Sequence, residues 1–134
     1  MAELSENEQT ENSTPDSSTA KQVLLAEDDA GIRSLLQKLL KAWGYRTLVA
    51  SDGKEALEVA AAHPGNIDLL LSDVTMPKVD GQELAERLTK VRPSIKVVLM
   101  SGFSHAHVVV QKGWKFIQKP FRPADVKNTI KEVL

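Results

Sequence analysis

No cysteine occurs among the 134 residues of this chain. Disulfide bonds, thiolate metal ligands and a thiol nucleophile are therefore excluded, and the composition does not indicate a redox compartment. The sequence also lacks an apolar run long enough to span a bilayer, and residues 1–20 lack the apolar core of a signal peptide. We therefore expect a soluble, cytoplasmic protein that has no direct contact with a membrane.

Basic residues are absent from residues 1–20, which hold five acidic ones. The rest of the chain carries 17 Lys and Arg against 13 Asp and Glu, an excess without a basic cluster, so we do not expect this domain to bind nucleic acid. Residues 1–20 are also too poor in large apolar side chains to offset the entropy of ordering. The sequence therefore predicts a disordered polar tail or linker over residues 1–20 and one folded domain over residues 21–134.

Short apolar segments alternate with amphipathic segments along the folded part. Apolar residues from Ile32 to Trp43 recur every three or four positions, which predicts a helix with Asp29 as its cap and Gly44 as its end. Strands are predicted over residues 23–26, 45–50, 67–73, 95–100 and 114–118, and further helices around residues 56–60, from residue 81 to before Pro93, and from Pro123. The alternation predicts a parallel sheet covered on both faces and joined by right-handed crossovers.

Two connections between these elements are distinctive. Asp52-Gly53 is predicted as a turn before the second helix. Residues 102–113 contain three consecutive valines, which are poor helix formers, and leave little room for a long helix. We therefore predict at most one irregular helical turn over residues 104–112, in the most mobile part of the domain.

Polar and charged side chains follow the predicted strands. Glu27 and Asp28 come after the first strand, Asp73 ends the third, Ser101 follows the fourth and Lys119 the fifth. In open α/β sheets, ligands bind outside the carboxyl ends of the strands. Each residue alone has an ordinary explanation as a helix cap, a turn residue or a surface charge, but their joint occurrence favours a functional site.

These residues lie in stretches that resemble the receiver domains of two-component response regulators. The stretches are Leu24–Asp29, Asp73–Pro77 followed by Asp80-Gly81, Met100–Gly102 and Lys119–Phe121. The resemblance extends over residues 21–134 and implies a flavodoxin-like, doubly wound α/β fold with five parallel strands in the order 2-1-3-4-5. The chain between Ser101 and Lys119 is about one helical turn shorter than in typical receivers, so the fourth helix is expected to be shortened or irregular.

The resemblance also implies a phosphoacceptor function. Asp73 would accept a phosphoryl group from a sensor histidine kinase or a histidine phosphotransfer protein, because carboxylates can form acyl phosphates. The charge that arrives with the phosphoryl group calls for a cation such as Mg²⁺, which prefers oxygen ligands. By the same resemblance, Asp28, Asp73 and the Thr75 backbone carbonyl bind the metal and Glu27 acts through water.

Further residues receive roles from the resemblance. Lys119 and Ser101 would contact phosphoryl oxygens, and the Lys119–Pro120 peptide bond is expected to be cis. Ser101 and Phe116 occupy the switch positions, and because Phe116 lacks a hydroxyl group it would act through ring position alone. Phosphorylation would switch a surface that binds a downstream partner.

Three alternative functions conflict with the residues present. An aspartyl phosphatase of the haloacid dehalogenase type needs a second Asp two positions after the first, where this chain has Thr75. A flavin carrier needs a hydroxyl- and glycine-rich loop after the first strand, where the acidic residues 27–29 would repel phosphate. A metal site at His105 and His107 lacks further ligands, so we interpret both as loop residues. We expect no enzyme beyond self-catalysed phosphoryl transfer and autodephosphorylation.

The sequences of two stretches resemble the receivers of hybrid kinases more than other receivers. These are Ser101–Phe103 and Phe116–Phe121. We expect no output domain after Leu134, and therefore either a stand-alone receiver or the receiver of a hybrid sensor histidine kinase. Trp43 and Trp114 are predicted to pack in or beside the core.

Overall fold

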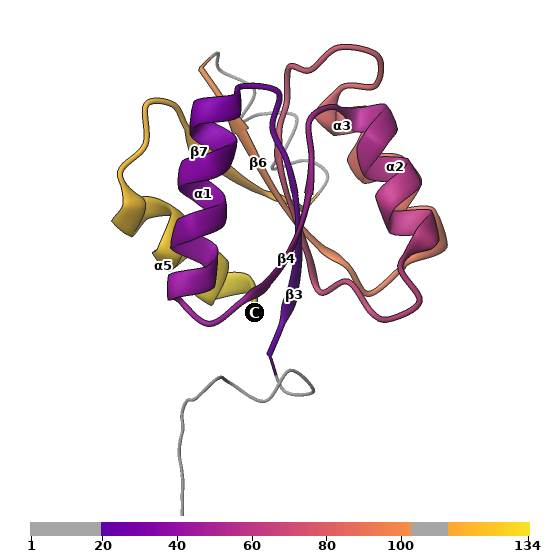
Figure 1. Ribbon diagram of the computed structural model, residues 1–134, viewed down its shortest axis with the longest axis horizontal. Coiled ribbons are helices and arrows are strands. Elements are labelled where there is room, and N and C mark those ends of the chain that lie inside the picture. Colours follow the sequence, from indigo (N-terminus) through magenta and orange to yellow (C-terminus); the bar gives the residue numbers. More distant parts are fainter. Residues whose placement is uncertain (1–19, 103–112) are drawn as a thin grey trace, which may run out of the picture.

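The computed structural model describes residues 20–102 and 113–134, in which five parallel strands form one sheet (Figure 1). The spatial order β4–β3–β5–β6–β7 corresponds to 2-1-3-4-5 along the chain, as predicted. The strands are β3 (Gln22–Ala26), β4 (Arg46–Ala50), β5 (Leu69–Asp73), β6 (Lys96–Ser101) and β7 (Lys115–Gln118). The helices of the described residues are α1 (Ala30–Ala42), α2 (Gly53–Ala62), α3 (Gly81–Val91) and α5 (Pro123–Val133).

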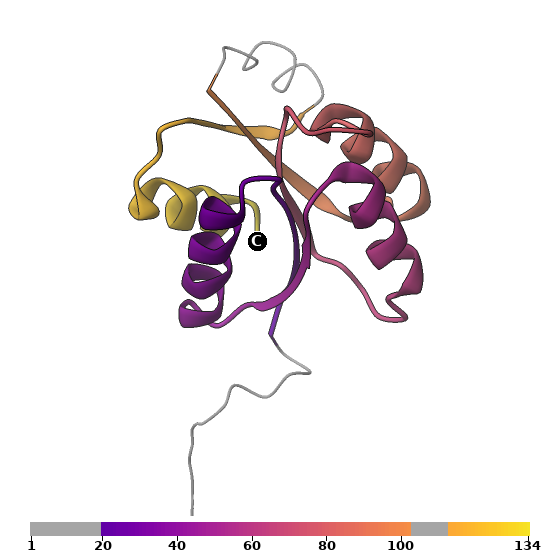
Figure 2. The ribbon, with the colours of Figure 1, turned by 45° about the horizontal axis from the view of Figure 1, so that its top comes forward.

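The helices cover both faces of the sheet. Helices α1 and α5 lie on one face and α2 and α3 on the other, which Figure 2 shows from above the carboxyl ends of the strands. The central strand β3 illustrates the reason, because Leu24 and Leu25 are both fully buried and belong to different core clusters. Successive side chains of a strand point to opposite faces, so a central strand must be apolar throughout. Trp43 and Trp114 pack against the two clusters, as predicted.

Aspartate side chains begin three of the helices. Asp29 caps α1 through a bond from the Ile32 backbone N–H, as predicted. Asp80 caps α3 through a bond from the Glu83 backbone N–H. Asp52 was predicted only as a turn residue, but it caps α2 by accepting the Glu55 backbone N–H at 2.7 Å. A carboxylate at this position satisfies a donor that the first turn of a helix leaves unpaired.

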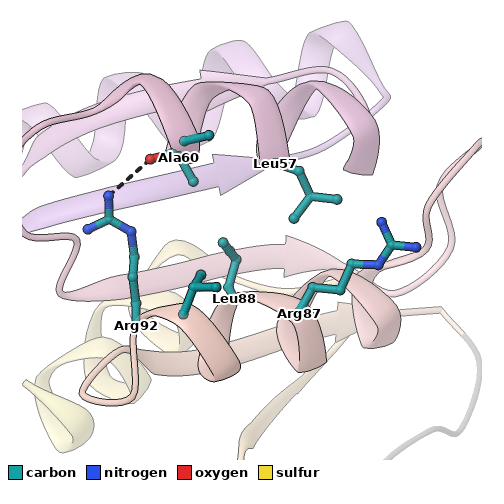
Figure 3. Close-up of a pocket in the computed structure, with 7 residues that line it drawn as sticks. Leu57, Ala60, Arg87, Leu88 and Arg92 are labelled. Atoms are coloured by element: carbon teal, nitrogen blue, oxygen red, sulfur yellow. Dashed lines mark hydrogen bonds between the residues drawn. The ribbon is translucent and has the colours of Figure 1, made fainter.

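An arginine joins the ends of α2 and α3 at the amino end of the sheet. Arg92 donates to the backbone carbonyls of Ala60, His63 and Gly65 at 2.9–3.0 Å, and Figure 3 shows its reach to Ala60. The bonds to Ala60 and His63 add partners for carbonyl groups at the end of α2, where a helix runs out of backbone donors, and the bond to Gly65 fixes the chain beyond it. Between the two helices lies an open groove of about 520 Å³, lined by Leu57, Ala60, Ala61, Arg87, Leu88, Val91 and Arg92.

Several expectations fall outside the described residues or stay untested. The irregular fourth helix, the mobility of residues 104–112 and the two histidines lie in the undescribed residues 103–112, and the predicted tail lies almost wholly in residues 1–19. Within the described residues, no helix is long and apolar enough to cross a membrane. The cytoplasmic location and the lack of nucleic-acid binding stay predictions.

Candidate functional site

The predicted site residues come from neighbouring strands that all end at one edge of the sheet. Glu27 follows β3, Asp73 ends β5, Ser101 ends β6 and Lys119 follows β7. The strand ladders continue into these residues, because the Glu27 backbone N–H donates to the carbonyl of Ala50 at 3.1 Å and that of Lys119 donates to Ser101 at 2.8 Å. The parallel register therefore brings together side chains that lie up to 92 positions apart in the chain.

Three carboxylates gather at this edge. Glu27, Asp28 and Asp73 each offer an oxygen atom, and these atoms lie within 4.8 Å of one another. Glu27 is fully buried and Asp73 is 8% exposed, whereas Asp28 is open to solvent. Carboxylates at such distances repel each other, and a divalent cation with oxygen ligands relieves that repulsion. The acidic cluster therefore offers oxygen donors of the kind that a Mg²⁺ ion prefers.

Lys119 bridges the two buried carboxylates. Its Nζ atom lies 3.1 Å from Glu27 Oε1 and 3.2 Å from Asp73 Oδ2, and its side chain is 19% exposed. Burial raises the pKa of Glu27, helped by the charge of Asp73 and opposed by bonds from the Asp29 N–H and Lys119. Burial also disfavours the charged form of Lys119, but the bond to Glu27 and the charges of Glu27 and Asp73 outweigh it and raise the pKa of the lysine. The ammonium group therefore stays charged beside the cluster.

The turn that carries Glu27 and Asp28 is held by two further contacts. The Asp29 backbone N–H donates to Glu27 Oε2 at 3.1 Å, and Arg33 Nη1 donates to the Glu27 carbonyl at 2.8 Å. Arg33 was not identified from the sequence. One feature of the sequence could have identified it. Arg33 lies four positions after Asp29, which places it on the helix face next to the acidic turn.

The remaining predicted residues occupy three different environments. Ser101 is buried at the end of β6, and Thr75 is exposed in the loop between β5 and α3. Phe116 is half-buried and packs against the core cluster on the face covered by α2 and α3. The Lys119–Pro120 peptide bond is cis, as predicted. The geometry thus brings Glu27, Asp28, Asp73 and Lys119 together.

The described fold and this acidic edge define a class of protein. Residues 23–131 match the family model of the response regulator receiver domain, and the chain belongs to this family. Receiver domains are modules of two-component signal transduction.

Two relatives with different architectures are similar to the chain. It is 36% identical over 118 residues to the response regulator receiver protein CpdR of Brucella abortus, a match that covers 85% of this chain and 97% of that protein. It is 34% identical over 123 residues to the sensor kinase CckA of the same organism, a match that covers 89% of this chain but only 13% of the kinase. The chain therefore compares with a whole small receiver protein and with a small part of a large kinase.

Solved structures give the same result. The receiver domain from the hybrid histidine kinase CckA superposes with a TM-score of 0.74 at 35% identity, covering 84% of this chain and 98% of that one. The response regulator protein TrrA from Thermotoga maritima, in complex with Mg(2+)-BeF, gives a TM-score of 0.75 at 30% identity, with coverage of 85% and 99%. The fold of the described residues is thus that of receiver domains.

Proposed function

We propose that this chain is a phosphoacceptor switch in which Asp73 accepts a phosphoryl group from the phosphohistidine of a histidine kinase or histidine phosphotransfer protein. One observation carries the proposal. The Asp73 carboxylate ends a central strand and lies beside two other carboxylates and a lysine ammonium group, at the edge where open α/β sheets bind ligands. Family membership supports the same assignment.

Mg²⁺ is the cofactor that fits the acidic cluster. Asp28, Asp73 and the Thr75 backbone carbonyl would hold the ion, and Glu27 would act through a bound water molecule. The bound ion would neutralise the phosphoryl oxygens, which otherwise could not approach three carboxylates within 4.8 Å of each other. The solved relative in complex with Mg(2+)-BeF supports this choice of metal.

The transfer itself requires little from the protein beyond position and charge. A carboxylate oxygen of Asp73 attacks the phosphorus atom, a P–O bond forms, and the P–N bond to the donor histidine breaks with its electron pair passing to the imidazole. Lys119, 3.2 Å from Asp73 Oδ2, would pair with a phosphoryl oxygen, and the Ser101 hydroxyl would bond to another. We assign the chain no reaction on a metabolite, only this transfer and its own dephosphorylation.

An apolar surface beside the site offers a place for the donor protein. Ile32, Leu35, Pro120 and Phe121 line a groove of about 480 Å³ next to Lys119, and Leu35 is 47% exposed. A large exposed apolar side chain in a groove that also contains Lys119, the ion-pair partner of Asp73, is the arrangement expected of a docking surface. We propose that the phosphodonor docks here, and that phosphorylation changes a second, downstream surface through Ser101 and Phe116.

Phosphoramidate tests the proposal, because it is a small P–N donor that needs no partner protein. With Mg²⁺ it should add one phosphoryl group to the chain, seen as a mass gain of the intact protein. Asp73→Asn should remove the gain, and chelation of Mg²⁺ should suppress it. The matched control is Asp29→Asn, which keeps a good cap on α1 and should label like the unchanged protein. Labelling of Asp73→Asn at the normal rate would refute the assignment.

The docking surface has its own test. Leu35→Asp should label normally with phosphoramidate and lose labelling by a histidine kinase that co-purifies with the chain. The control is Val91→Asp, which changes an exposed apolar residue on the opposite face of the sheet. Equal loss in both variants, or none in either, would show that the donor docks elsewhere.

A further inference from the structure

The first turn of α2 touches the loop over residues 74–80, which follows Asp73. A Cβ atom on Gly53 would lie 1.9 Å from the Val79 carbonyl oxygen and 2.7 Å from its carbonyl carbon. Because side-chain Cβ atoms do not approach other atoms closer than 3.0 Å, this contact requires glycine. The backbone of α2 therefore packs directly on the backbone of the loop.

A second contact lies beside the first. Lys78 Nζ is 3.6 Å from Asp52 Oδ2, and the Asp52 carboxylate simultaneously caps α2 through the Glu55 N–H. Lys78 has a φ of 73°, in the left-handed region that residues other than glycine rarely occupy. Two neighbouring residues at the start of α2 thus contact two neighbouring residues of the loop.

Backbone hydrogen bonds fix both ends of the loop, so a displacement of Val79 must be accommodated within the loop. The Val74 N–H donates to Met100 and the Gly81 N–H donates to Val74, each at 2.8 Å. A Cβ atom on Gly81 would lie 2.1 Å from the Asp73 carbonyl oxygen, so the loop also closes tightly on the strand that carries Asp73. A displacement at Val79 would therefore pass into residues 75–78.

We infer that Asp52 and Gly53 are positioning residues for the metal site: the start of α2 sets where the Thr75 backbone carbonyl lies relative to Asp28 and Asp73. The inference rests on the proposed function, since it takes Thr75 as a metal ligand. Neither residue touches the metal or the phosphoryl group. Both act through the loop, as groups around a metal site orient its direct ligands.

Gly53→Ala is the variant that tests the inference. Restoring ordinary contact would require α2 and residue 79 to separate by about 1 Å, and misplacement of that size at a reactive centre is costly. We expect Mg²⁺ affinity to fall about tenfold, the lower end of the effect for groups that orient metal ligands. A Mg²⁺ titration followed by amide NMR gives the affinity, and thermal unfolding without Mg²⁺ gives the stability. Phosphoramidate labelling should fall at low Mg²⁺ and recover at saturating Mg²⁺, which a general loss of folding would not do.

Gly65→Ala is the matched control. The three atoms nearest to its added Cβ atom would all belong to the flexible side chain of His63, the closest at 3.2 Å, and the residue lies beyond the other end of α2. Mg²⁺ affinity equal to that of the unchanged protein is expected. If Gly53→Ala also bound Mg²⁺ normally, the inference would be overturned while the proposed function stood. If the unchanged protein bound no Mg²⁺, the proposed function would fail and the inference with it.

Asp52→Asn keeps the test decisive if Gly53→Ala does not fold. Asn is as good a cap as Asp, so α2 should persist while the charge facing Lys78 disappears. Because exposed ion pairs contribute little, we expect Mg²⁺ affinity to fall only about twofold at low salt, with the difference vanishing at high salt. Unchanged affinity at low salt in this variant would overturn the inference.

Discussion

Two long basic side chains cross between elements at opposite ends of the sheet, and they differ in what they meet. Arg92, at the amino end, donates to three neutral carbonyls and completes the hydrogen bonding at the end of α2. Lys119, at the carboxyl end, meets two buried carboxylates, with the third carboxylate of Asp28 close by. The contacts of Arg92 at the amino end leave no charge that needs a further partner. At the carboxyl end, three carboxylates carry more negative charge than Lys119 balances. Such an imbalance is tolerated where a bound cation completes the site.

Of the predictions that follow, Asp28→Ala should have the largest effect, on the function of the carboxyl end of the sheet. Loss of one metal ligand should lower phosphoramidate labelling at millimolar Mg²⁺ by about 100-fold. Stability without Mg²⁺ should not fall, because the variant removes one of three repelling carboxylates. Intact-mass labelling rates and thermal unfolding measure the two quantities. Normal labelling, or a clear loss of stability without metal, would contradict the assigned role of Asp28.

Arg92→Ala should give the opposite result. It removes charge-assisted bonds to three carbonyls and should lower the free energy of unfolding by about 2 kcal/mol. Labelling with phosphoramidate at a temperature where the variant is folded should be unchanged. Urea denaturation and labelling rates check both parts. A variant of full stability, or one with slowed labelling, would remove the distinction between the two ends.

The smallest expected effect is on the pH dependence of folding stability, which Glu27 at the carboxyl end of the sheet should influence. Burial raises the pKa of Glu27 in the folded protein above its ordinary value of 4.5. The folded state therefore binds this proton more readily than the unfolded state, so its contribution to stability without Mg²⁺ rises as the pH falls from neutral toward about 4.5. Glu27→Gln should remove that part of the slope in urea denaturation. An identical pH dependence in the variant would contradict the expectation.

The difference between the two ends also shows what the sequence could predict. The parallel sheet followed from the alternation of strands and helices, and the strand order from the resemblance to receiver domains. The meeting of Glu27, Asp73 and Lys119 was predictable because parallel strands end at one edge and each residue sits at a strand end. The cap formed by Asp29 was predictable for a local reason, since it bonds three residues away.

Contacts between elements were not predictable in the same way. Arg92 bonds to carbonyls 27–32 positions away, and Gly53 touches Val79, without any pattern that marks either pair. Asp52 looked like a turn residue because the same residue type serves turns and caps. These contacts depend on how helices and loops pack, and periodicity along the chain does not record that. The switch roles of Ser101 and Phe116 stay predictions.

The most direct test of the central claim locates the phosphoryl group. After phosphoramidate labelling with Mg²⁺, hydroxylamine converts an acyl phosphate into a hydroxamate, and peptide mass spectrometry identifies the modified residue. We predict a hydroxamate at Asp73 alone, with Glu27 and Asp28 unmodified although they lie in the same cluster. A hydroxamate at Asp28 or Glu27, or a phosphoryl group that resists hydroxylamine, would contradict it.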